Sequence, residues 1–489
     1  MLKKYLDNFS QKRSRGAAGI LAITLLTMPA SINAANLQLP DMGETASSYL
    51  SIEDEKRIGS DFMRMVRQSL DILEDPLIED YIQSLGIRVT TGNFSSHREF
   101  NFFVVNSSVV NAFAGPAGNI GIHSGLILTA QSEGELASVV AHEIAHVTQR
   151  HLARAVENSA EKSIPLTAAI VAALILSQAD SQLGQAALLS ATAGNVQQQI
   201  NFTRDNEKEA DRIGLEILAN AGFNPREMPV FFERMLKSSG NNETPYLEFL
   251  RTHPLSTSRI ADTQNRAEQY PAIRKNDSLT FLLIQARIRA LMANDILDVN
   301  NNYPKLNTLS TDEQYGYALG LTRNKNFKKA KTILKTLIKN DPDRIAYQLA
   351  LADIEIKQNN IQSALNILSR YLELYPRNYP LTVKYAELLI DNRQTNTAKK
   401  LINEQLRIRK PTPILYKLLS YAENESGNNA QAYFALAEHQ FLVGNSFAAI
   451  LNIKQALRLI KKDQTLLKLK LETRLKYFEE QLEKLEEKH

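Results

Sequence analysis

The sequence of 489 residues contains no cysteine. The chain therefore forms no disulfide even in an oxidising compartment, and its N-terminus cannot carry a lipid attached to a cysteine. A metal site in this chain also has no thiolate ligand, so its ligands are histidine and carboxylate side chains. The chain has no long low-complexity tract either, and 44% hydrophobic with 22% charged residues is typical of a folded protein. This length predicts two or three domains.

Long apolar runs are also absent. The longest are residues 17–30, about 14 residues, and 164–176, about thirteen residues interrupted by Pro165, whereas a membrane-spanning helix needs roughly 20. The first run follows a basic segment and precedes the small residues SINAAN, the order of a secretory signal peptide. We expect residues 1–34 to be a signal peptide cut after Ala34, with a retained signal anchor as the alternative. We expect the second run to be a buried helix, with membrane contact as the alternative.

Excess charge is confined to the N-terminus. The formal net charge is +4, and the first fifteen residues alone contribute five basic residues against one acidic residue. The rest of the chain is therefore close to neutral. This balance argues against a nucleic-acid-binding protein, which would carry a basic field over its folded part.

The hydrophobic pattern changes along the first half of the chain. Apolar residues recur at helical spacing from about 44 to 85, and residues 99–128 are rich in Phe, Val and Ile with Gly, Pro and Asn between them. The second pattern predicts a small sheet of short strands. Residues 133–154 return to helical spacing. A strand edge before this helix could pair with an extended peptide.

Small residues in the second half recur every 34 positions. One series is Ala318, Ala352, Ala386 and Ser420, and the other is Ala330, Ala364, Ala398 and Ala432. Two small residues per 34, twelve apart, mark where the paired helices of a tetratricopeptide repeat cross closely, and Pro342 and Pro376 close two of the repeats. We predict four repeats over 311–446. The charged end, LKLETRLKYFEEQLEKLEEKH, suits a capping helix, with a coiled-coil partner helix as the alternative, and 263–278 is the best linker candidate.

The segment HEIAH carries a pattern for metal chemistry. His142 and His146 are four residues apart, so on a helix they share one face and can bind one metal ion. Glu143 lies beside that face, where its carboxylate can take a proton from a water molecule that zinc has made more acidic. The alternative is an ordinary helix with polar residues on its surface. His151 follows His142 by nine residues and is predicted on the opposite face.

A catalytic zinc needs a third protein ligand, which here is His, Asp or Glu. In FTRDNEKEADRIGLEIL, Glu207 and Asp211 share a helical face, and Glu209 points roughly 200° away from Glu207. Glu207 as the ligand and Asp211 as the hydrogen-bond acceptor for a ligand histidine would complete the site. The alternative is a solvated acidic face.

Four motifs together resemble one family. HEIAHVTQRH, NAFAGPAGNIGIHSGLI, NEKEAD and THPLSTSRI are similar to motifs of the zinc metallopeptidases that include HtpX and the CAAX prenyl proteases, and the resemblance covers essentially the whole mature chain. It implies one Zn²⁺ per subunit and selects Glu207 as the third ligand. It also implies that His253 can bind the metal as a fourth ligand and shut the site. Arg259 could steady the His253 loop or a substrate carbonyl.

The resemblance implies an α+β metallopeptidase domain, mostly helical with a small β-sheet and the zinc site on a helix, followed by an all-α tetratricopeptide-repeat solenoid. We expect the signal peptide at 1–34, the peptidase domain at 35–265, and the repeat domain with its capping helix at 276–489. Membrane-embedded relatives have transmembrane helices around the catalytic core, whereas this chain has only the run at 164–176. That difference favours a soluble or peripherally membrane-associated enzyme.

The signal peptide and the repeats are typical of the family's periplasmic branch in Gram-negative bacteria. For that branch the resemblance implies a zinc endopeptidase for quality control and assembly of outer-membrane β-barrel proteins, with a chaperone-like repeat domain. The implied partners are misassembled proteins such as LptD and the β-barrel assembly machinery, with peripheral contact to the inner or outer membrane and no nucleic acid. The alternative is a non-proteolytic periplasmic chaperone or scaffold with a closed or vestigial zinc site. Glu143 argues against the alternative, because a structural site needs no base.

Overall fold

The computed structural model describes most of the chain. The described residues are 51–91, 99–159, 196–239, 244–273, 277–293, 308–461 and 463–486. The predicted signal peptide, 1–34, and the apolar run at 164–176 lie outside them. Within the described ranges, no helix combines the length and the apolar character needed to cross a membrane.

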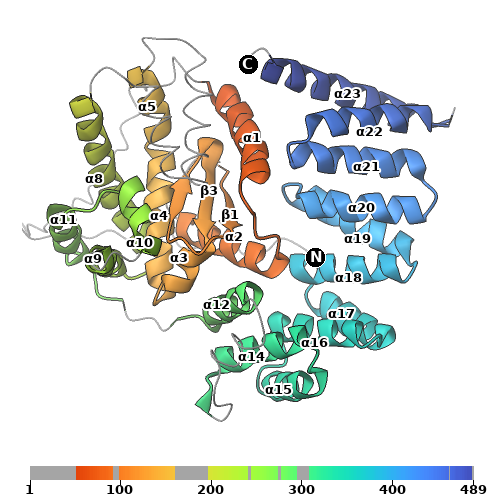
Figure 1. Ribbon diagram of the computed structural model, residues 1–489, viewed down its shortest axis with the longest axis horizontal. Helices are drawn as coiled ribbons and strands as arrows, with labels where there is room; N and C mark the ends of the chain where they lie inside the picture. The colour runs from red at the N-terminus through yellow and green to blue at the C-terminus, as the bar shows by residue number, and fades with distance from the viewer. Residues whose placement is uncertain are drawn as a thin grey trace, which may run out of the picture. The chain divides into compact units, whose positions relative to one another are not determined.

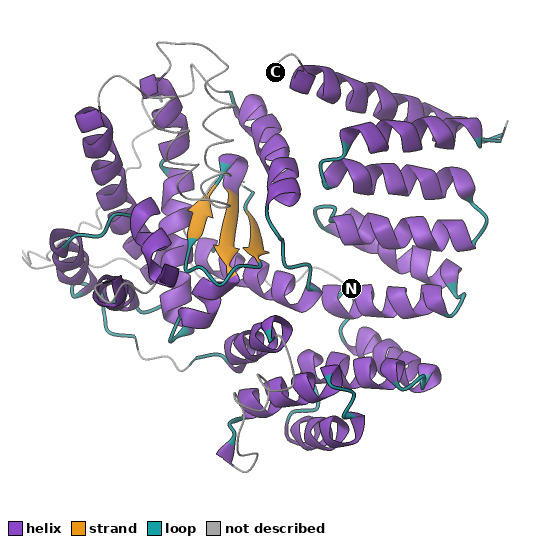
Figure 2. Ribbon diagram, in the orientation of Figure 1, coloured by secondary structure: helices purple, strands orange, loops and turns teal. Residues whose placement is uncertain are grey.

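The first part of the chain is mostly helical around one small sheet (Figure 1, Figure 2). Its helices are α1 (Ile52–Ser69), α2 (Pro76–Thr90), α3 (Ser124–Thr129), α4 (Glu133–Thr148), α5 (His151–Ser159), α8 (Val196–Asn220), α9 (Glu227–Ser239), α10 (Thr244–Thr252) and α11 (Thr257–Ala267). Local sequence sets several helix starts. Ser132 accepts a hydrogen bond from the Glu135 N–H at the start of α4, and Ser256 does the same for Arg259 at the start of α11.

The sheet has three strands in the order β1-β3-β2. β1 (Asn101–Val105) pairs parallel with β3 (Asn119–His123), and β2 (Ala112–Ala114) pairs antiparallel with β3. The predicted small sheet is confirmed, but its predicted extent was too long. Residues 124–129 form the helix α3 instead of a strand. The sequence pattern did not distinguish the two, because an apolar run as short as SGLIL fits a buried helical turn as well as a strand.

Helix α4 is buried on nearly all sides. Leu136, Val140 and Ile144 are fully buried in a core shared by α2, the sheet, α8 and α9. A helix packed on every side is held rigidly, which suits a site whose geometry must be fixed.

The helix predicted for 133–154 is broken in the structure. α4 ends at Thr148, Arg150 adopts a left-handed backbone (φ 52°), and α5 begins at His151. The position predicted for His151, on the face opposite His142, assumed one continuous helix and is wrong. The turn at Arg150 brings His151 back beside His146.

The four predicted repeats are confirmed as four helix pairs. They are α14 (Thr311–Arg323) with α15 (Phe327–Asn340), α16 (Ile345–Lys357) with α17 (Ile361–Leu374), α18 (Tyr379–Asp391) with α19 (Thr395–Ile408), and α20 (Pro413–Glu425) with α21 (Asn429–Leu442). Every small residue of the two 34-residue series is buried. Small side chains are required there because larger ones would push the crossing helices apart.

The turns inside the repeats follow the same period. Lys325, Asn359, Arg393 and Gly427, each in the turn between two paired helices, all have a positive φ of 59° to 72°. Only one of the four is glycine. The tight turn is therefore enforced by the packing of the two helices, with little contribution from the local residue preference.

We predict that enlarging one crossing residue weakens the repeats. Ala364 is fully buried, so Ala364→Leu should lower the free energy of unfolding by about 1–3 kcal/mol through overpacking. Ser363 is adjacent and exposed, so Ser363→Leu is the matched control and should change the free energy by no more than about 0.5 kcal/mol. Urea unfolding measures both, and equal losses in the two variants would contradict the crossing role of Ala364.

The C-terminal helices α22 (Ser446–Arg458) and α23 (Thr465–Glu486) follow the repeats. α23 buries Leu471 and Phe478 against α21 and α22 and exposes most of its charged side chains. This arrangement is that of a capping helix for a solenoid.

The linker predicted at 263–278 is shorter in the structure. Residues 263–267 are the last turn of α11, where Thr263 and Ala267 are buried, and α12 (Leu279–Met292) begins soon after. The polar composition of this segment concealed two inward-facing residues. α12 packs one face, with Phe281, into the core around α4 and another face, with Leu283, into the first repeat.

Candidate metal centre

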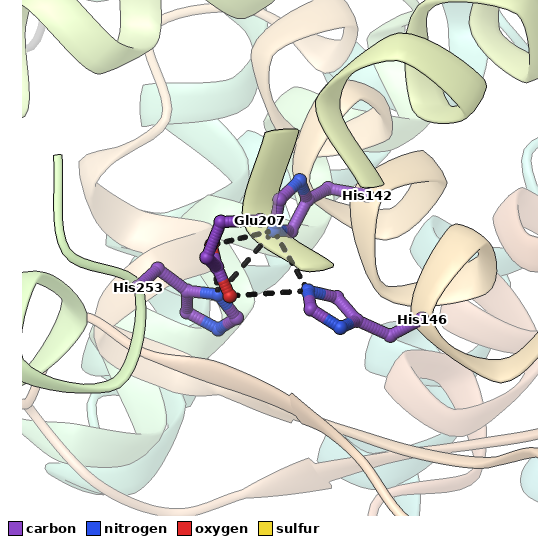
Figure 3. A group of neighbouring side chains, drawn as sticks. All are labelled: His142, His146, Glu207 and His253. Carbon is purple, nitrogen blue, oxygen red and sulfur yellow. Dashed lines mark hydrogen bonds and ion pairs between the residues drawn. The ribbon is translucent and has the colours of Figure 1, made fainter. Parts of the chain in front are cut away.

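Four side chains from three elements point toward one another (Figure 3). His142 and His146 come from α4, Glu207 from α8, and His253 from the turn after α10. One nitrogen or oxygen atom from each lies within 4.8 Å of those of the other three. The structure thus brings together the four residues that the sequence predicted as metal ligands.

The separations between these atoms fit a tetrahedral metal ion. His142 Nε2 lies 3.1 Å from His146 Nε2, 3.3 Å from His253 Nδ1 and 3.4 Å from Glu207 Oε2. Glu207 Oε1 lies 3.4 Å from His146 Nε2, and Glu207 Oε2 lies 3.2 Å from His253 Nδ1. Bonds of about 2.0–2.1 Å to zinc would place neighbouring tetrahedral ligands roughly 3.3–3.4 Å apart. The side chains present therefore fit a metal ion bound by three imidazoles and one carboxylate.

The charges in the cluster also call for a cation. Burial raises the pKa of the Glu207 carboxyl, but His253, His142 and His146 outweigh this effect and hold the pKa well below its usual range. Burial lowers the pKa of His142, but hydrogen bonds to Asp211 and Glu207 raise it to about 10. Without a metal, the cluster therefore holds a proton beside its carboxylates. Metal binding would displace this proton.

Asp211 holds the far side of the His142 ring. His142 Nδ1 lies 3.1 Å from Asp211 Oδ1, which leaves Nε2 facing the cluster. The Arg259 guanidinium donates two hydrogen bonds of 2.7 Å to Asp211 and also lies 3.0 Å from Glu207. Gly214 lets α8 pack closely against α4 at His142, because a Cβ at Gly214 would lie 3.2 Å from the His142 backbone. A lone glycine inside a helical pattern, such as Gly214, is the sequence signal for close helix packing of this kind.

We predict that the buried ion pair between Asp211 and Arg259 stabilises the protein measurably. Asp211→Asn keeps the side-chain size but removes the charge that faces Arg259, so the free energy of unfolding of the metal-free protein should fall by about 1–2 kcal/mol. Asp262→Asn is the control, because Asp262 pairs with Arg266 on the exposed face of α11 and should contribute less than about 0.5 kcal/mol. Chemical unfolding compares them. Equal losses of the free energy of unfolding in the two variants would show that burial does not strengthen the pair between Asp211 and Arg259.

His253 contacts the cluster and the predicted base together. Its Nδ1 faces Glu207, and its Nε2 lies 3.3 Å from Glu143 Oε1. Arg259 donates a hydrogen bond of 2.8 Å to the Pro254 carbonyl, so it holds the His253 segment as well as Asp211. The imidazole thereby occupies both the fourth position of the cluster and the side of Glu143 that a reacting water would need.

Glu143 lies between the metal cluster and the sheet. Its carboxylate accepts a hydrogen bond from the Ala114 backbone at the end of β2, and burial raises its pKa. A carboxylate with a raised pKa is a stronger base for proton transfer near neutral pH. The sequence placed Glu143 beside the metal-binding face, and the structure adds its contact with the strand edge.

Two further polar residues lie behind His146 and were not predicted as part of the site. His151 Nδ1 lies 2.8 Å from His146 Nδ1, and His151 Nε2 lies 3.1 Å from Glu209 Oε2. The sequence placed His151 on the helical face opposite His142, packed or exposed, and Glu209 roughly 200° away from Glu207. The spacing of His151 was no guide, since the helix breaks before it.

Comparison with known proteins identifies the family of the chain. Residues 76–267 match peptidase family M48, and residues 355–420 match a tetratricopeptide repeat. The chain is 36% identical to the "Beta-barrel assembly-enhancing protease" of Escherichia coli over 460 residues, which are 92% of this chain and 93% of that protein. The Yersinia pestis protein of the same name is 35% identical, over 88% of this chain and 91% of its own length. The "Mitochondrial metalloendopeptidase OMA1" of Schizosaccharomyces pombe is 31% identical over 43% of this chain and 60% of its own.

Proposed function

Because this chain belongs to the β-barrel assembly-enhancing proteases, with their peptidase domain of family M48, we propose that it is a zinc endopeptidase of the periplasm that acts in quality control and assembly of outer-membrane β-barrel proteins. The observation that carries the proposal is the close spacing of four donor atoms, three of them from buried residues, beside a buried carboxylate. In this proposal residues 35–265 form the catalytic domain and residues 276–489 recognise partners. Residues 1–34 direct export.

Three residues hold the zinc ion of the active enzyme in this proposal. They are His142, His146 and Glu207, a set of two histidines and one carboxylate that leaves one position open. When bound, zinc polarises a substrate carbonyl and lowers the pKa of a water molecule toward about 7. Asp211 acts on the site through the His142 ring, whose Nδ1 it faces.

Glu143 is the proposed general base. Its Oε1 takes the proton from the attacking water and later returns it to the leaving amine nitrogen. Burial supports this role in two ways: it raises the pKa of the carboxyl and keeps competing water away. The Ala114 N–H fixes the carboxylate relative to the strand edge, so that the base and a bound peptide keep a constant separation.

The outer edge of β2 is the proposed substrate-binding strand. Asn111 and Gly115 bond to β3 through their backbones, so the backbone groups of Ala112 and Ala114 point to the other side. Within the described ranges, no strand pairs with that side. An extended peptide added there would run past Glu143, in the manner of β-strand addition.

Substrate access requires the His253 segment to move. Thr252 donates a hydrogen bond of 3.1 Å to the Asn111 side chain, next to β2, and His253 fills the fourth position of the cluster. We assign His253 as an inhibitory fourth ligand, which is replaced by water in the active state. With four protein ligands a zinc site has the closed coordination of a structural site, and loss of one ligand would leave the open position that a catalytic site needs.

The closed site also favours a second function for the same molecule. A protein whose base and cluster are covered can act as a scaffold, and tetratricopeptide repeats form surfaces that bind other proteins. In this proposal the repeats bind misassembled outer-membrane proteins such as LptD and the β-barrel assembly machinery, in peripheral contact with a membrane. The names of the relatives support a role in β-barrel assembly.

A deletion strain separates the two functions. Glu143→Gln, expressed at the native level, should leave misassembled LptD undegraded while the repeats still bind it. Co-purification of LptD with the variant measures binding, and the lifetime of misassembled LptD measures degradation. Normal degradation by Glu143→Gln would refute the endopeptidase function, whereas full rescue of assembly would assign assembly to the scaffold.

A further inference from the structure

The His146 ring has a contact on the side away from the cluster. Its Nε2 faces His142 and Glu207, while its Nδ1 lies 2.8 Å from His151 Nδ1. His151 is buried, and its other nitrogen, Nε2, lies 3.1 Å from the Glu209 carboxylate. Arg154 pairs with the same Glu209 oxygen. Four residues thus form a line from the surface of α8 to the metal cluster.

The direction of the hydrogen bonds along this line follows from the chemistry of its members. A carboxylate paired with arginine only accepts hydrogen bonds, so Glu209 requires a proton on His151 Nε2. A neutral His151 then has a lone pair on Nδ1, which can accept only from a proton on His146 Nδ1. With its proton on Nδ1, His146 presents an unprotonated Nε2 to the cluster. Only an unprotonated nitrogen can bind a metal.

We propose that His151 and Glu209 are positioning residues that fix the metal-binding tautomer and orientation of His146. This inference rests on the zinc site of the proposed function and adds two residues to it. Reversed hydrogen bonds would place the His146 proton on Nε2, between the ring and the metal. Glu209 prevents that reversal because an ionised carboxylate has no proton to donate.

The contacts behind the His146 ring parallel those behind the ring of His142, the other histidine of HEIAH. His142 Nδ1 faces Asp211, and Asp211 is bonded to Arg259. His146 Nδ1 faces His151, which reaches Glu209 and Arg154. The acidic segment of α8 therefore has three separate uses: Glu207 faces the cluster, and its two neighbours at 209 and 211 each orient one histidine.

The break between α4 and α5 makes the second arrangement possible. On a continuous helix His151 would lie on the opposite side from His142, but the left-handed backbone at Arg150 redirects the chain. His151 then starts a new helix with its ring against His146. Burial of the ring keeps water from substituting for either hydrogen bond.

Zinc affinity of the full mature chain, measured by competition with a chelator at fixed pH, tests the assignment. His151→Phe keeps the ring but removes both nitrogens and should weaken zinc binding about 10- to 100-fold, the usual effect of losing such a partner. His151→Asn places an amide oxygen where Nδ1 was, so it should restore binding to within about threefold of the unaltered protein. The absorption of the Co²⁺-loaded proteins should follow the same order.

Glu209 gives an independent test. Glu209→Ala should weaken zinc binding about 10-fold in the unaltered background. In the His151→Asn background it should have little effect, because the amide accepts the His146 proton without help from Glu209. Lys208→Ala, the exposed neighbour on α8, is the control and should leave zinc affinity unchanged.

Each outcome discriminates. The positioning role is refuted if His151→Phe binds zinc as tightly as the unaltered protein. It is also refuted if His151→Asn and His151→Phe lose zinc affinity equally. Urea unfolding of the metal-free variants identifies any loss that comes from a damaged fold, and such a loss would be shared by His151→Asn. If the unaltered protein itself binds no zinc, the proposed function fails instead.

Discussion

Replacing Glu143 by glutamine should lower kcat/KM for peptide-bond hydrolysis by about 10²- to 10⁴-fold, the range contributed by a positioned general base. The amide has nearly the same shape as the carboxylate but cannot accept the proton from the attacking water. Glu143 donates no atom to the metal cluster, so the variant should keep its full zinc content. Loss of turnover with retained metal separates a base from a ligand.

The measurement is single-substrate kinetics on an unfolded polypeptide, with zinc content determined on the same sample. Glu216→Gln makes the same chemical change at an exposed position of α8 and should leave kcat/KM unaltered. Retention of more than about a tenth of the activity by Glu143→Gln would assign the proton transfer to another group, because a base is expected to contribute at least about 10²-fold.

The second large expected effect is an increase in kcat/KM for peptide-bond hydrolysis. His253→Ala should raise kcat/KM about 10- to 100-fold, because the ring is hydrogen-bonded to the charged Glu207, and one hydrogen bond to a charged group contributes about 1.5–3 kcal/mol to the closed state. The three remaining protein ligands should still hold zinc. Removing the ring also frees the side of Glu143 that faces the open position.

Arg251→Ala is the control for this prediction, because Arg251 belongs to the same segment and has an exposed side chain. It should leave the rate unchanged. If His253→Ala cuts no faster than the unaltered protein while holding the same amount of zinc, His253 is not an inhibitory ligand, and its place in the cluster is only structural.

The repeat domain was predictable because the small residues that its helix packing requires recur every 34 positions in the sequence. Each buried crossing needs a small residue, so Ala352 and Ala386 repeat at the same interval as the helices that carry them. HEIAH and the pair Glu207 and Asp211 were predictable for a similar reason, since i and i+4 share a helical face.

The remaining parts of the site depend on turns and on contacts between distant segments. His253 lies 111 residues from His142, and no periodicity connects the two, so only the family resemblance indicated it. His151 was misplaced because Arg150 adopts a left-handed backbone that is rare for a residue other than glycine and has no sequence signal. α3 was misassigned because a mainly apolar segment of only six residues fits either a strand or a helix.

The central claim is that His142, His146 and Glu207 would hold zinc and that the protein, when loaded with zinc, hydrolyses peptide bonds with Glu143 as the base. Its most direct test is cleavage of an unfolded polypeptide by the His253→Ala protein, whose site should be open, before and after removal of the metal by a chelator and again after addition of one equivalent of zinc. The account predicts cleavage, its loss with the metal, and its return with zinc. A zinc-loaded His253→Ala protein that leaves the polypeptide intact would contradict it.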